Sequence, residues 1–475
     1  MNIQKGFEKI KHRQIKNFLI NTGPEKLLKK TEKNVLSAFR RAASVIPAYN
    51  EILRKQGVTV NEVRTLSDFK EKVPVMTKKD FFVPYEAKEW IGNIQFSKVK
   101  NFMVSSGFSG TFAFGADTGI TRKIKNGVDF TLDYLFNTSD KKTFLINCVP
   151  MGVHVATSLP LAETSVRSDM VMAFVKKISP NFDQTIIVGD PHFLKKIIEE
   201  GLASGFNWQK INVSLICGQD WFPEAFREYL ACLTGMDIYH DNSRKIIATM
   251  GMTELGLNVF HESFDTIRIR NQARHNAGLR QHLTGNANLP VPLLFHYYPM
   301  RTFIEEKNEE HNDTSLLFSV TDKHSVIPLM RYDTGDSGTL ISYKNLSETL
   351  AMQNLHSMSP ELKLPLAAIH GRRNNYVLYK GNRVYASQIK SGLYEDFDLA
   401  GKTTGYFRIS MVKNTPQIEL QLKPGVRPER SLTSAFGYAL LKYADADIQV
   451  KCYNYQEFPY NMELSYEHKF INIIT

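Results

Sequence analysis

Apolar runs of strand length alternate with helical patterns through the middle of this chain. Residues 143–149, 185–189 and 213–218 are such runs, and helical patterns follow the second and the third. Asp190 and Pro191, directly after the second run, suit the cap and the first turn of a helix. Because strands that alternate with helices form a largely parallel sheet covered on both faces, this pattern predicts an α/β fold.

The length of the chain predicts more than one domain. One hydrophobic core stops growing near about 250–300 residues, and this chain has 475. The pattern changes near residue 370, where a run of short elements begins. These are a hairpin (377–385), a helix (387–397), two strands (406–412 and 417–422), a second helix (429–443) and a last strand (448–455). We predict a large N-terminal α/β domain, 1–369, and a small C-terminal α+β domain, 370–475.

Four short polar segments lie in a fixed order along the chain. They are Ser-Ser-Gly-Phe-Ser-Gly at 105–110, Gly-Met-Thr-Glu at 251–254, Arg-Tyr-Asp-Thr-Gly-Asp at 331–336 and Gly-Arg-Arg-Asn at 371–374. Small residues let the backbone approach phosphate oxygens, and their N–H and hydroxyl groups donate hydrogen bonds to them. Taken singly, the segments also suit an ordinary loop, a helix cap or a surface turn.

In their order and separation, the four segments resemble the motifs of the adenylate-forming enzymes, and within them the phenylacetate-CoA ligase-like branch. The resemblance spans about residues 70–470, and residues 72–80 are similar to a segment near the start of those ligases, with Thr77 as a candidate helix cap. It implies a large N-terminal α/β domain and a small C-terminal α+β lid, with ATP at their junction. It also implies activation of a carboxylic acid as an acyl-AMP, which a thiol then attacks.

The resemblance assigns the first segment to the ATP phosphates. The residues that fit the family's loop are Ser105, Ser106, Gly107, Ser109 and Gly110. Phe108 replaces a hydroxyl group with a ring, and the lysine that follows the family's loop is absent. In the second segment, Gly251 and Met252 precede Thr253, whose hydroxyl contacts the α-phosphate, and Glu254, which helps to hold Mg²⁺. Met250 stands where an adenine-stacking tyrosine is usual, and Gly218 begins the adenine-side segment.

The remaining segments would complete the site. By resemblance, the carboxylate of Asp336 accepts hydrogen bonds from both ribose hydroxyls, and Arg372 reaches the same sugar. Asn374 takes the position of the hinge between the two domains. Lys469, near the C-terminus, would bridge the carboxylate and the phosphate as negative charge gathers in the transition state. Together with Thr253 and Glu254, it is a candidate catalytic residue.

The expected function is therefore ATP-dependent activation of an aryl or fatty acid and its transfer to a thiol, with ATP, Mg²⁺ and CoA as ligands. Two alternatives stay open. In the first, the thiol acceptor is a carrier or acceptor protein instead of CoA. In the second, the chain is a catalytically impaired paralogue that acts as a partner or scaffold, because Phe108, Met250 and the missing lysine depart from the family. Tyr239, His240 and Phe222 are candidates for an aromatic acid pocket.

Charge and cysteine usage exclude several other classes. The net charge is +11, but lysine and arginine are dispersed, which favours a solvated basic surface over a nucleic-acid interface. The four cysteines form no CxxC pair, and no histidine pattern indicates a metal site, so reduced thiols in a cytoplasmic protein are expected. Residues 1–23 suggest an amphipathic helix, and no run of about 18 apolar residues predicts a membrane span. A homodimer is the default assembly.

Overall fold

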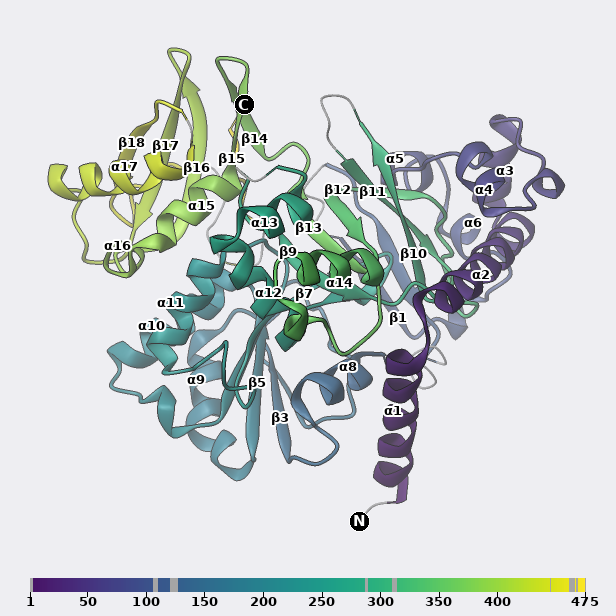
Figure 1. The fold of residues 1–475 in the computed structure, drawn as a ribbon, viewed down its shortest axis with the longest axis horizontal. Coiled ribbons are helices and arrows are strands. Elements are labelled where there is room, and N and C mark those ends of the chain that lie inside the picture. Colours follow the sequence, from purple (N-terminus) through teal and green to yellow (C-terminus); the bar gives the residue numbers. More distant parts are fainter. Residues whose placement is uncertain are drawn as a thin grey trace.

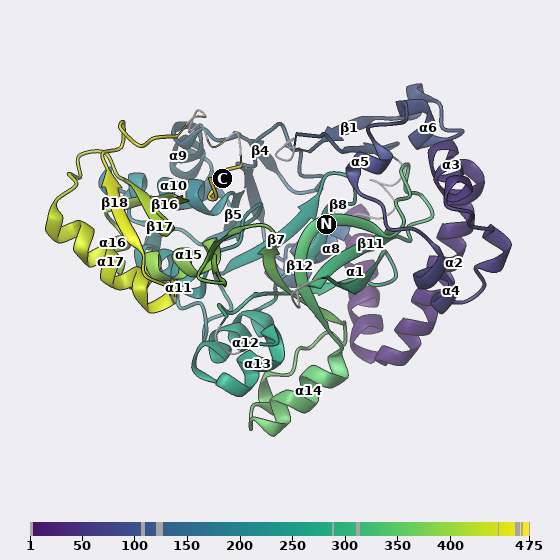
Figure 2. The same cartoon turned by 90° about the horizontal axis from the view of Figure 1, so that it is seen from above.

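The chain folds into a large N-terminal part and a small C-terminal part that lies against one end of it (Figure 1). The computed structural model describes residues 3–105, 110–119, 127–286, 289–309, 314–444, 446–460, 466 and 469–474. Within these residues, no helix combines the length and the hydropathy that a membrane crossing needs. Figure 2 shows the C-terminal part and helices α2, α3 and α4 at opposite ends of the molecule.

The elements of the N-terminal part follow the chain in this order. The helices are α1 (Ile3–Asn21), α2 (Pro24–Val45), α3 (Pro47–Lys55), α4 (Leu66–Lys72), α5 (Lys78–Phe81), α6 (Ala87–Ile91), α8 (Gly127–Phe136), α9 (Ser168–Lys177), α10 (Pro191–Ala203), α11 (Glu224–Thr234), α12 (Phe264–His275), α13 (Ala277–Thr284) and α14 (Tyr343–Met352). The strands are β1 (Asn101–Val104), β2 (Phe114–Asp117), β3 (Thr143–Asn147), β4 (Leu161–Glu163), β5 (Gln184–Gly189), β6 (Val213–Cys217), β7 (Ile246–Met252), β8 (Gly256–His261), β9 (Leu293–Tyr297), β10 (Thr302–Asn308), β11 (Thr314–Val320), β12 (Tyr332–Ile341) and β13 (Leu366–Arg372).

One long sheet of 11 strands organises this part, in the order β10-β11-β12-β13-β9-β8-β7-β6-β5-β3-β4. Strands β4, β3, β5, β6 and β7 pair in parallel, as the alternation of strands and helices predicted. The strands from β7 to β10 pair antiparallel, so the prediction of a mostly parallel sheet was wrong for this half. The physical reason is that connections such as the one between β7 and β8 are too short for a parallel crossover.

The parallel half is covered on both faces, as its apolar strands require. Every residue of β3, β5 and β6 is buried. Leu145 and Ile186 pack with helices α8 and α12, whereas Ile146 and Ile187 belong to the cluster that includes α9, α10 and α11. In Figure 1, α8 lies on one side of β3 and β5, and α9 and α10 lie on the other. The alternation of side chains along each strand therefore builds two separate cores on one sheet.

The C-terminal part contains the elements expected after residue 370. They are the hairpin β14 (Tyr376–Tyr379) and β15 (Asn382–Tyr385), the helices α15 (Ala386–Glu395), α16 (Phe397–Ala400) and α17 (Arg430–Ala444), and a sheet of β16 (Thr403–Val412), β17 (Thr415–Leu422) and β18 (Gln449–Tyr453). Strand β13 stays in the large sheet as far as Arg372, so the connection between the parts is residues 373–375. The division at 369 and 370 remains a prediction.

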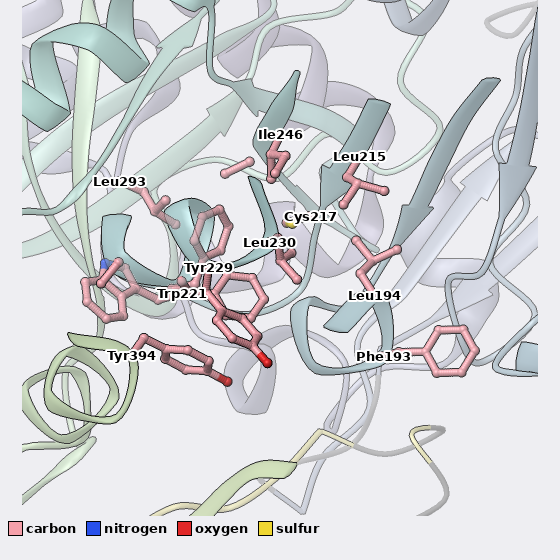
Figure 3. Packing of buried hydrophobic residues seen from close by; sticks show 14 of the residues in the cluster. Phe193, Leu194, Leu215, Cys217, Trp221, Tyr229, Leu230, Ile246, Leu293 and Tyr394 are labelled. Atoms are coloured by element: carbon pink, nitrogen blue, oxygen red, sulfur yellow. The ribbon is translucent and has the colours of Figure 1, made fainter. Parts of the chain in front are cut away.

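The two parts share one apolar interface. Tyr394 of α15 meets Phe226 and Tyr229 of α11, with ring centroids 4.9 and 6.1 Å apart. Figure 3 shows Tyr394 facing Tyr229 beside Trp221. All of these aromatic residues belong to one buried cluster that continues into both parts. The C-terminal part is therefore held by core-like packing as well as by its covalent connection.

A buried network of four charges lies beneath β7 and β8. Arg227 is 2.8 Å from Glu262 and 3.0 Å from Glu224, and Arg270 also pairs with Glu224. All four side chains are almost fully shielded from solvent. Glu262 accepts a hydrogen bond of 2.6 Å from the N–H of Ala248, which lies in β7. The network thus holds the strand that leads into the Thr253–Glu254 segment.

We expect Glu262→Ala to lower the free energy of unfolding by about 3–5 kcal/mol, because it leaves the Arg227 guanidinium buried with too little counter-charge. The matched control is Glu228→Ala, which removes the partner of Arg274 in a pair that retains access to water. That control should cost about 0.2–1 kcal/mol. Urea titration of the first unfolding transition measures both variants, and equal losses would contradict the assigned role of the network.

Candidate nucleotide site

Asp336 and Arg372 face each other across two neighbouring strands. They are direct partners in the antiparallel pairing of β12 with β13. Nε of Arg372 lies 3.3 Å from Oδ1 of Asp336, and the Thr334 hydroxyl donates to Oδ2 at 2.7 Å. Asp336 is 4% exposed, whereas about half of the Arg372 side chain is accessible. The sheet therefore presents an oriented carboxylate with a reachable guanidinium beside it.

Two glycines allow this arrangement. Gly335 and Gly371 have φ angles of 81° and 118°, in the region that favours residues without a side chain. At Gly335 the chain turns so that the N–H of Arg373 reaches its carbonyl oxygen at 3.1 Å, and Arg372 donates to the carbonyl oxygen of Thr334. The third and fourth polar segments of the sequence are consequently one structural unit.

The segment around residue 76 is attached to the same unit. The N–H of Met76 donates to the carbonyl of Arg331 at 3.1 Å, and the N–H of Asp333 donates to the carbonyl of Met76 at 2.8 Å. Thr77 then caps α5, as predicted, with Asp80 completing a capping box. This docking brings the first helical residue, Lys78, to the candidate site.

Lys78 lies within range of the charges of two residues that the motifs had singled out, Glu254 and Arg372. Burial lowers its pKa and the charge of Arg372 acts in the same direction, whereas the carboxylate of Glu254 acts in the opposite direction. Our sequence reasoning did not include Lys78 among the site residues. The similarity of residues 72–80 to the start of the ligases was the signal that pointed to it.

Thr253 and Glu254 form the turn between β7 and β8, where Met252 pairs with Gly256. The alternative that this segment caps a helix is therefore wrong. Burial raises the pKa of Tyr332. The negative charge of Glu254 raises it further, and the Tyr332 hydroxyl donates a hydrogen bond to that carboxylate. Because Tyr332 begins β12, the turn with Glu254 lies next to the strand that carries Asp336.

The predicted phosphate loop connects β1 and β2. At its base, Ser105 donates its N–H to the carbonyl of Ala113 at 2.9 Å and accepts the N–H of Ala113 on its hydroxyl at 2.8 Å. Gly110 is described with a φ of 77°. The other predicted members of the loop, Ser106, Gly107 and Ser109, lie outside the described residues.

The β1–β2 hairpin packs directly on the Thr253–Glu254 turn. The Thr253 hydroxyl donates to the carbonyl oxygen of Val104 at 3.4 Å. A Cβ atom at Gly115 would lie only 2.1 Å from the carbonyl oxygen of Thr253, so only glycine permits this approach. The close packing places the base of the predicted phosphate loop beside the predicted α-phosphate ligand, while Gly251 and Met252 lie on β7 just before the turn.

Lys469 lies among the same charged groups. Burial lowers its pKa, and the positive charge of Arg372 acts in the same direction. Three carboxylates act in the opposite direction, namely those of Asp336, Asp220 and Glu254. The structure thus brings the lysine near the C-terminus to the segments that lie far from it in sequence.

The residues that follow Lys469 explain how it reaches this position. Asn472 accepts the N–H of Ile409 on its carbonyl oxygen at 2.6 Å, and Ile474 donates to the carbonyl of Ile409 at 2.9 Å, which adds the segment to β16. The ring of Phe470 stacks on Tyr406 and Tyr460 at 4.5 and 4.3 Å. Lys469 is therefore supported by an ordered, aromatic anchor on the C-terminal part.

The adenine-side segment also contacts the C-terminal part. The N–H of Gly218 donates to the carbonyl of Gly189 at 2.9 Å, and the next residue but one, Asp220, forms an ion pair with Lys390 of α15. Lys390 also donates to the carbonyl of Trp221 at 3.3 Å and is 4% exposed. No local motif marked Lys390, so sequence reasoning missed this contact.

Several predicted residues lie away from these groups. Phe222 is in the buried cluster, the Tyr239 hydroxyl bonds to Glu224, and His240 is exposed beside Asp237. They do not form an aromatic acid pocket together. Asn374 is exposed in the connection between β13 and β14, and its role as a hinge remains a prediction.

A cavity of about 200 Å³ opens beside the Thr253–Glu254 turn instead. Strands β1 and β2 contribute Met103 and Gly115, and the start of α8 contributes Gly127. Arg301 and the residues of 320–327 other than Thr321 and Lys323 complete much of its wall. The cavity therefore meets the site at the residues that are predicted to bind the α-phosphate and the metal.

The donor set fits one ATP-bound Mg²⁺ ion. Among the residues that the structure describes, no group of three or more histidine, cysteine, aspartate or glutamate side chains is arranged to hold a metal. Glu254 offers a carboxylate at the turn, whereas Asp336 is engaged by Thr334 and Arg372. Magnesium is commonly held by one or two carboxylates together with substrate phosphates, which agrees with Glu254 as the protein ligand.

Known structures share this arrangement of the chain. The sequence matches no protein-family profile and no curated protein. A 2-hydroxyisobutyryl-CoA ligase in the postadenylation state with 2-HIB-AMP matches with a TM-score of 0.67 and 11% identity, over 95% of this chain and 89% of that one. The chain has the fold of this CoA ligase. The predicted fold of an adenylate-forming enzyme is thereby confirmed.

The same ligase has been solved in other states. With 2-HIB-AMP and CoA in the thioesterification state, it matches with a TM-score of 0.56 and 11% identity, over 96% of this chain and 90% of that one. An open conformation with the same ligands also gives 0.56, at 12% identity, over 95% and 92%. The three values come from one protein, and the overall arrangement of this chain matches the postadenylation structure more closely than the other two.

We expect Lys390→Met to loosen the contact between the two parts, because it removes an ion pair and a hydrogen bond from a buried interface. Hydrogen exchange in α15 should become about 10- to 100-fold faster, equivalent to about 1.5–3 kcal/mol for hydrogen bonds to a charged group. Lys380→Met is the matched control, since its pair with Asp447 is exposed in the same part. Unchanged exchange in Lys390→Met would show that apolar packing alone holds the interface.

We also expect a pH-dependent stability from Asp190, the cap of α10. Burial raises its pKa to about 7 and Asp220 adds to this, while N–H groups of α10 and the charge of Lys390 oppose it. The folded state therefore favours the protonated acid, so its stabilising contribution is complete below about pH 4 and is lost as the pH rises through about 7.

Asp190→Asn should remove this dependence while keeping a capping side chain. The stability of the original protein relative to this variant should fall by up to about 1.4 kcal/mol per pH unit between pH 4 and 7. Urea titrations at several pH values measure the difference. Parallel stability curves for the two proteins would contradict the raised pKa.

Proposed function

We propose that this protein is an AMP-forming acid–thiol ligase that activates a carboxylic acid with ATP and Mg²⁺ and transfers the acyl group to a thiol. The observation that carries the proposal is the pairing of Asp336 with Arg372 at 3.3 Å, with Lys469 close enough that the charges of Asp336, Asp220 and Glu254 oppose the lowering of its pKa by burial. These groups come from segments that the chain order keeps far apart. The shared fold with the 2-hydroxyisobutyryl-CoA ligase, in complexes with 2-HIB-AMP and CoA, supports it.

In the first step, an oxygen of the substrate carboxylate attacks the α-phosphorus of ATP. The bond from that phosphorus to the bridging oxygen breaks, and pyrophosphate leaves with the electron pair. Asp336 orients the ribose as a hydrogen-bond acceptor, and Arg372 holds the same end of the nucleotide. Glu254 would hold Mg²⁺, which would supply positive charge to the departing phosphates. Lys469 places a positive charge where negative charge gathers in the transition state.

In the second step, a thiol sulfur attacks the acyl carbon and gives up its proton. The bond between that carbon and the AMP oxygen breaks, and AMP leaves. We propose CoA as the acceptor, because CoA is bound in the similar ligase. A carrier or acceptor protein is the alternative, and the phenylacetate-CoA ligase-like branch is part of the proposal.

Lys78 supports an active enzyme over an impaired paralogue. The loop after Gly110 lacks the lysine that is usual in the family, and that absence favoured a scaffold role. Lys78 supplies a cation next to Glu254 and Arg372 from a different segment. A positive charge at this place serves the same electrostatic purpose toward ATP phosphates.

The test is pyrophosphate–ATP exchange across a panel of aryl, fatty and dicarboxylic acids. We expect Asp336→Asn and Lys469→Ala each to lower exchange with the best acid by about 100- to 1,000-fold, since each removes a group aimed at the nucleotide or the transition state. Lys442→Ala, an exposed lysine of the same C-terminal part, should leave exchange unchanged. No exchange with any acid, together with no ATP binding by calorimetry, would overturn the proposal in favour of a scaffold.

A further inference from the structure

The cavity beside the Thr253–Glu254 turn has one charged side chain whose purpose the fold does not explain. Arg301 lies between β9 and β10 and lines the cavity. A Cβ atom at Gly127 would lie 2.0 Å from its Nη1, so the guanidinium occupies the space that a glycine leaves at the start of α8. Burial raises the pKa of Tyr298 to about 12, and the nearby charge of Arg301 opposes that rise. The guanidinium is therefore held against the wall.

Arg301 has no carboxylate partner among the residues that the structure describes. Segments 106–109 and 120–126, which lie outside the described residues, contain neither aspartate nor glutamate. The two fully buried arginines Arg227 and Arg270, by contrast, are matched to glutamates. An arginine that lines a cavity without an internal counter-charge is suited to an anionic ligand.

The carboxylates in the same wall already have partners. Asp322 accepts the N–H of His324 at 2.9 Å and lies near Arg41. Asp117 accepts the N–H of Gly119 at 2.8 Å. Glu254 accepts the Tyr332 hydroxyl and is the proposed metal ligand. Each of these carboxylates thus has a hydrogen-bond partner, and Arg301 remains the charge to be matched.

We propose that the acid activated by this protein is small and carries a second anionic group, as a short dicarboxylic acid does, and that Arg301 binds that group. This inference rests on the proposed function. One carboxylate lies at the Thr253–Glu254 turn, where it attacks the α-phosphorus, and the other pairs with the planar fork of Arg301. The volume of about 200 Å³ is below the roughly 300–1,000 Å³ of pockets for drug-sized ligands, which favours a short acid.

Matched pairs of acids test the inference in the exchange assay. Butyrate is compared with succinate, valerate with glutarate, and benzoate with terephthalate. We expect the original protein to favour the diacid of at least one pair by about 10-fold or more in kcat/KM, because a site built around a charged group rejects the analogue that lacks it.

Arg301→Gln should lower kcat/KM for the preferred diacid by about 10- to 100-fold and change that for its monoacid by less than about 3-fold. Arg301→Lys keeps the charge but not the planar fork. Its kcat/KM for the preferred diacid should lie between those of the original protein and of Arg301→Gln. Lys323→Gln is the control for the loss of one charge, since this exposed residue lies between two cavity residues but is outside the wall. Circular dichroism establishes that each variant is folded.

Three outcomes would overturn the inference. The first is a preference for monoacids in every pair. The second is an equal loss of kcat/KM for both members of a pair in Arg301→Gln. The third is a higher KM for ATP in Arg301→Gln with every acid, which would place a phosphate of ATP on Arg301. In each of these cases acid activation itself stands, so the proposed function survives.

A binding measurement covers the case in which no acid supports exchange. Saturation-transfer NMR then reports whether the diacid contacts the protein without any chemistry. Binding that is lost in Arg301→Gln but kept in Lys323→Gln would retain the anion site and reject the proposed reaction. No binding to the original protein would reject both.

Discussion

The antiparallel pairing of β12 with β13 is the constraint on which the candidate site depends. It sets Asp336 directly opposite Arg372. The register then shifts between Ser337, which pairs with Gly371, and Gly338, which pairs with Ile369. A Cβ atom at Gly338 would lie 2.7 Å from the carbonyl oxygen of Ala368, so the register tolerates no side chain there. A slip of one residue would turn Asp336 to the other face of the sheet. The remaining groups of the site assemble around this pair.

Two kinds of ionic contact serve different purposes in this protein. The network of Arg227 and Arg270 with their glutamates is fully buried and holds β7, which ends at the Thr253–Glu254 turn. The pair of Asp220 with Lys390 joins the two parts of the chain at the edge of the site. The first stabilises the frame of the site, and the second positions the C-terminal part that carries Lys469.

The local patterns predicted some parts of the structure and missed others for physical reasons. Buried apolar runs and the cap at Asp190 predicted β5, β6 and α10, because parallel strands and helices have distinct periodicities. The antiparallel half of the sheet was not predicted, because its strands show no comparable alternation of buried apolar runs with helices. Motif similarity singled out Asp336, Arg372 and Lys469, which the structure places near one another. Lys390 and Arg301 were missed because a single basic residue forms no pattern, whereas Lys78 lies in the 72–80 segment, whose similarity to the ligases was not followed to a site residue.

The sequence by itself determined the α/β class, the two-part organisation and the residue types at the turns, since these depend on hydrophobic periodicity and on backbone preferences within a few residues. Only the tertiary structure decided which charges meet. Lys469 comes within range of the charge of Asp336 because its segment is added to β16 and anchored by Phe470, and Arg301 lines a cavity because Gly127 leaves space for it. Such contacts depend on how distant segments pack, and no local property of the chain encodes them.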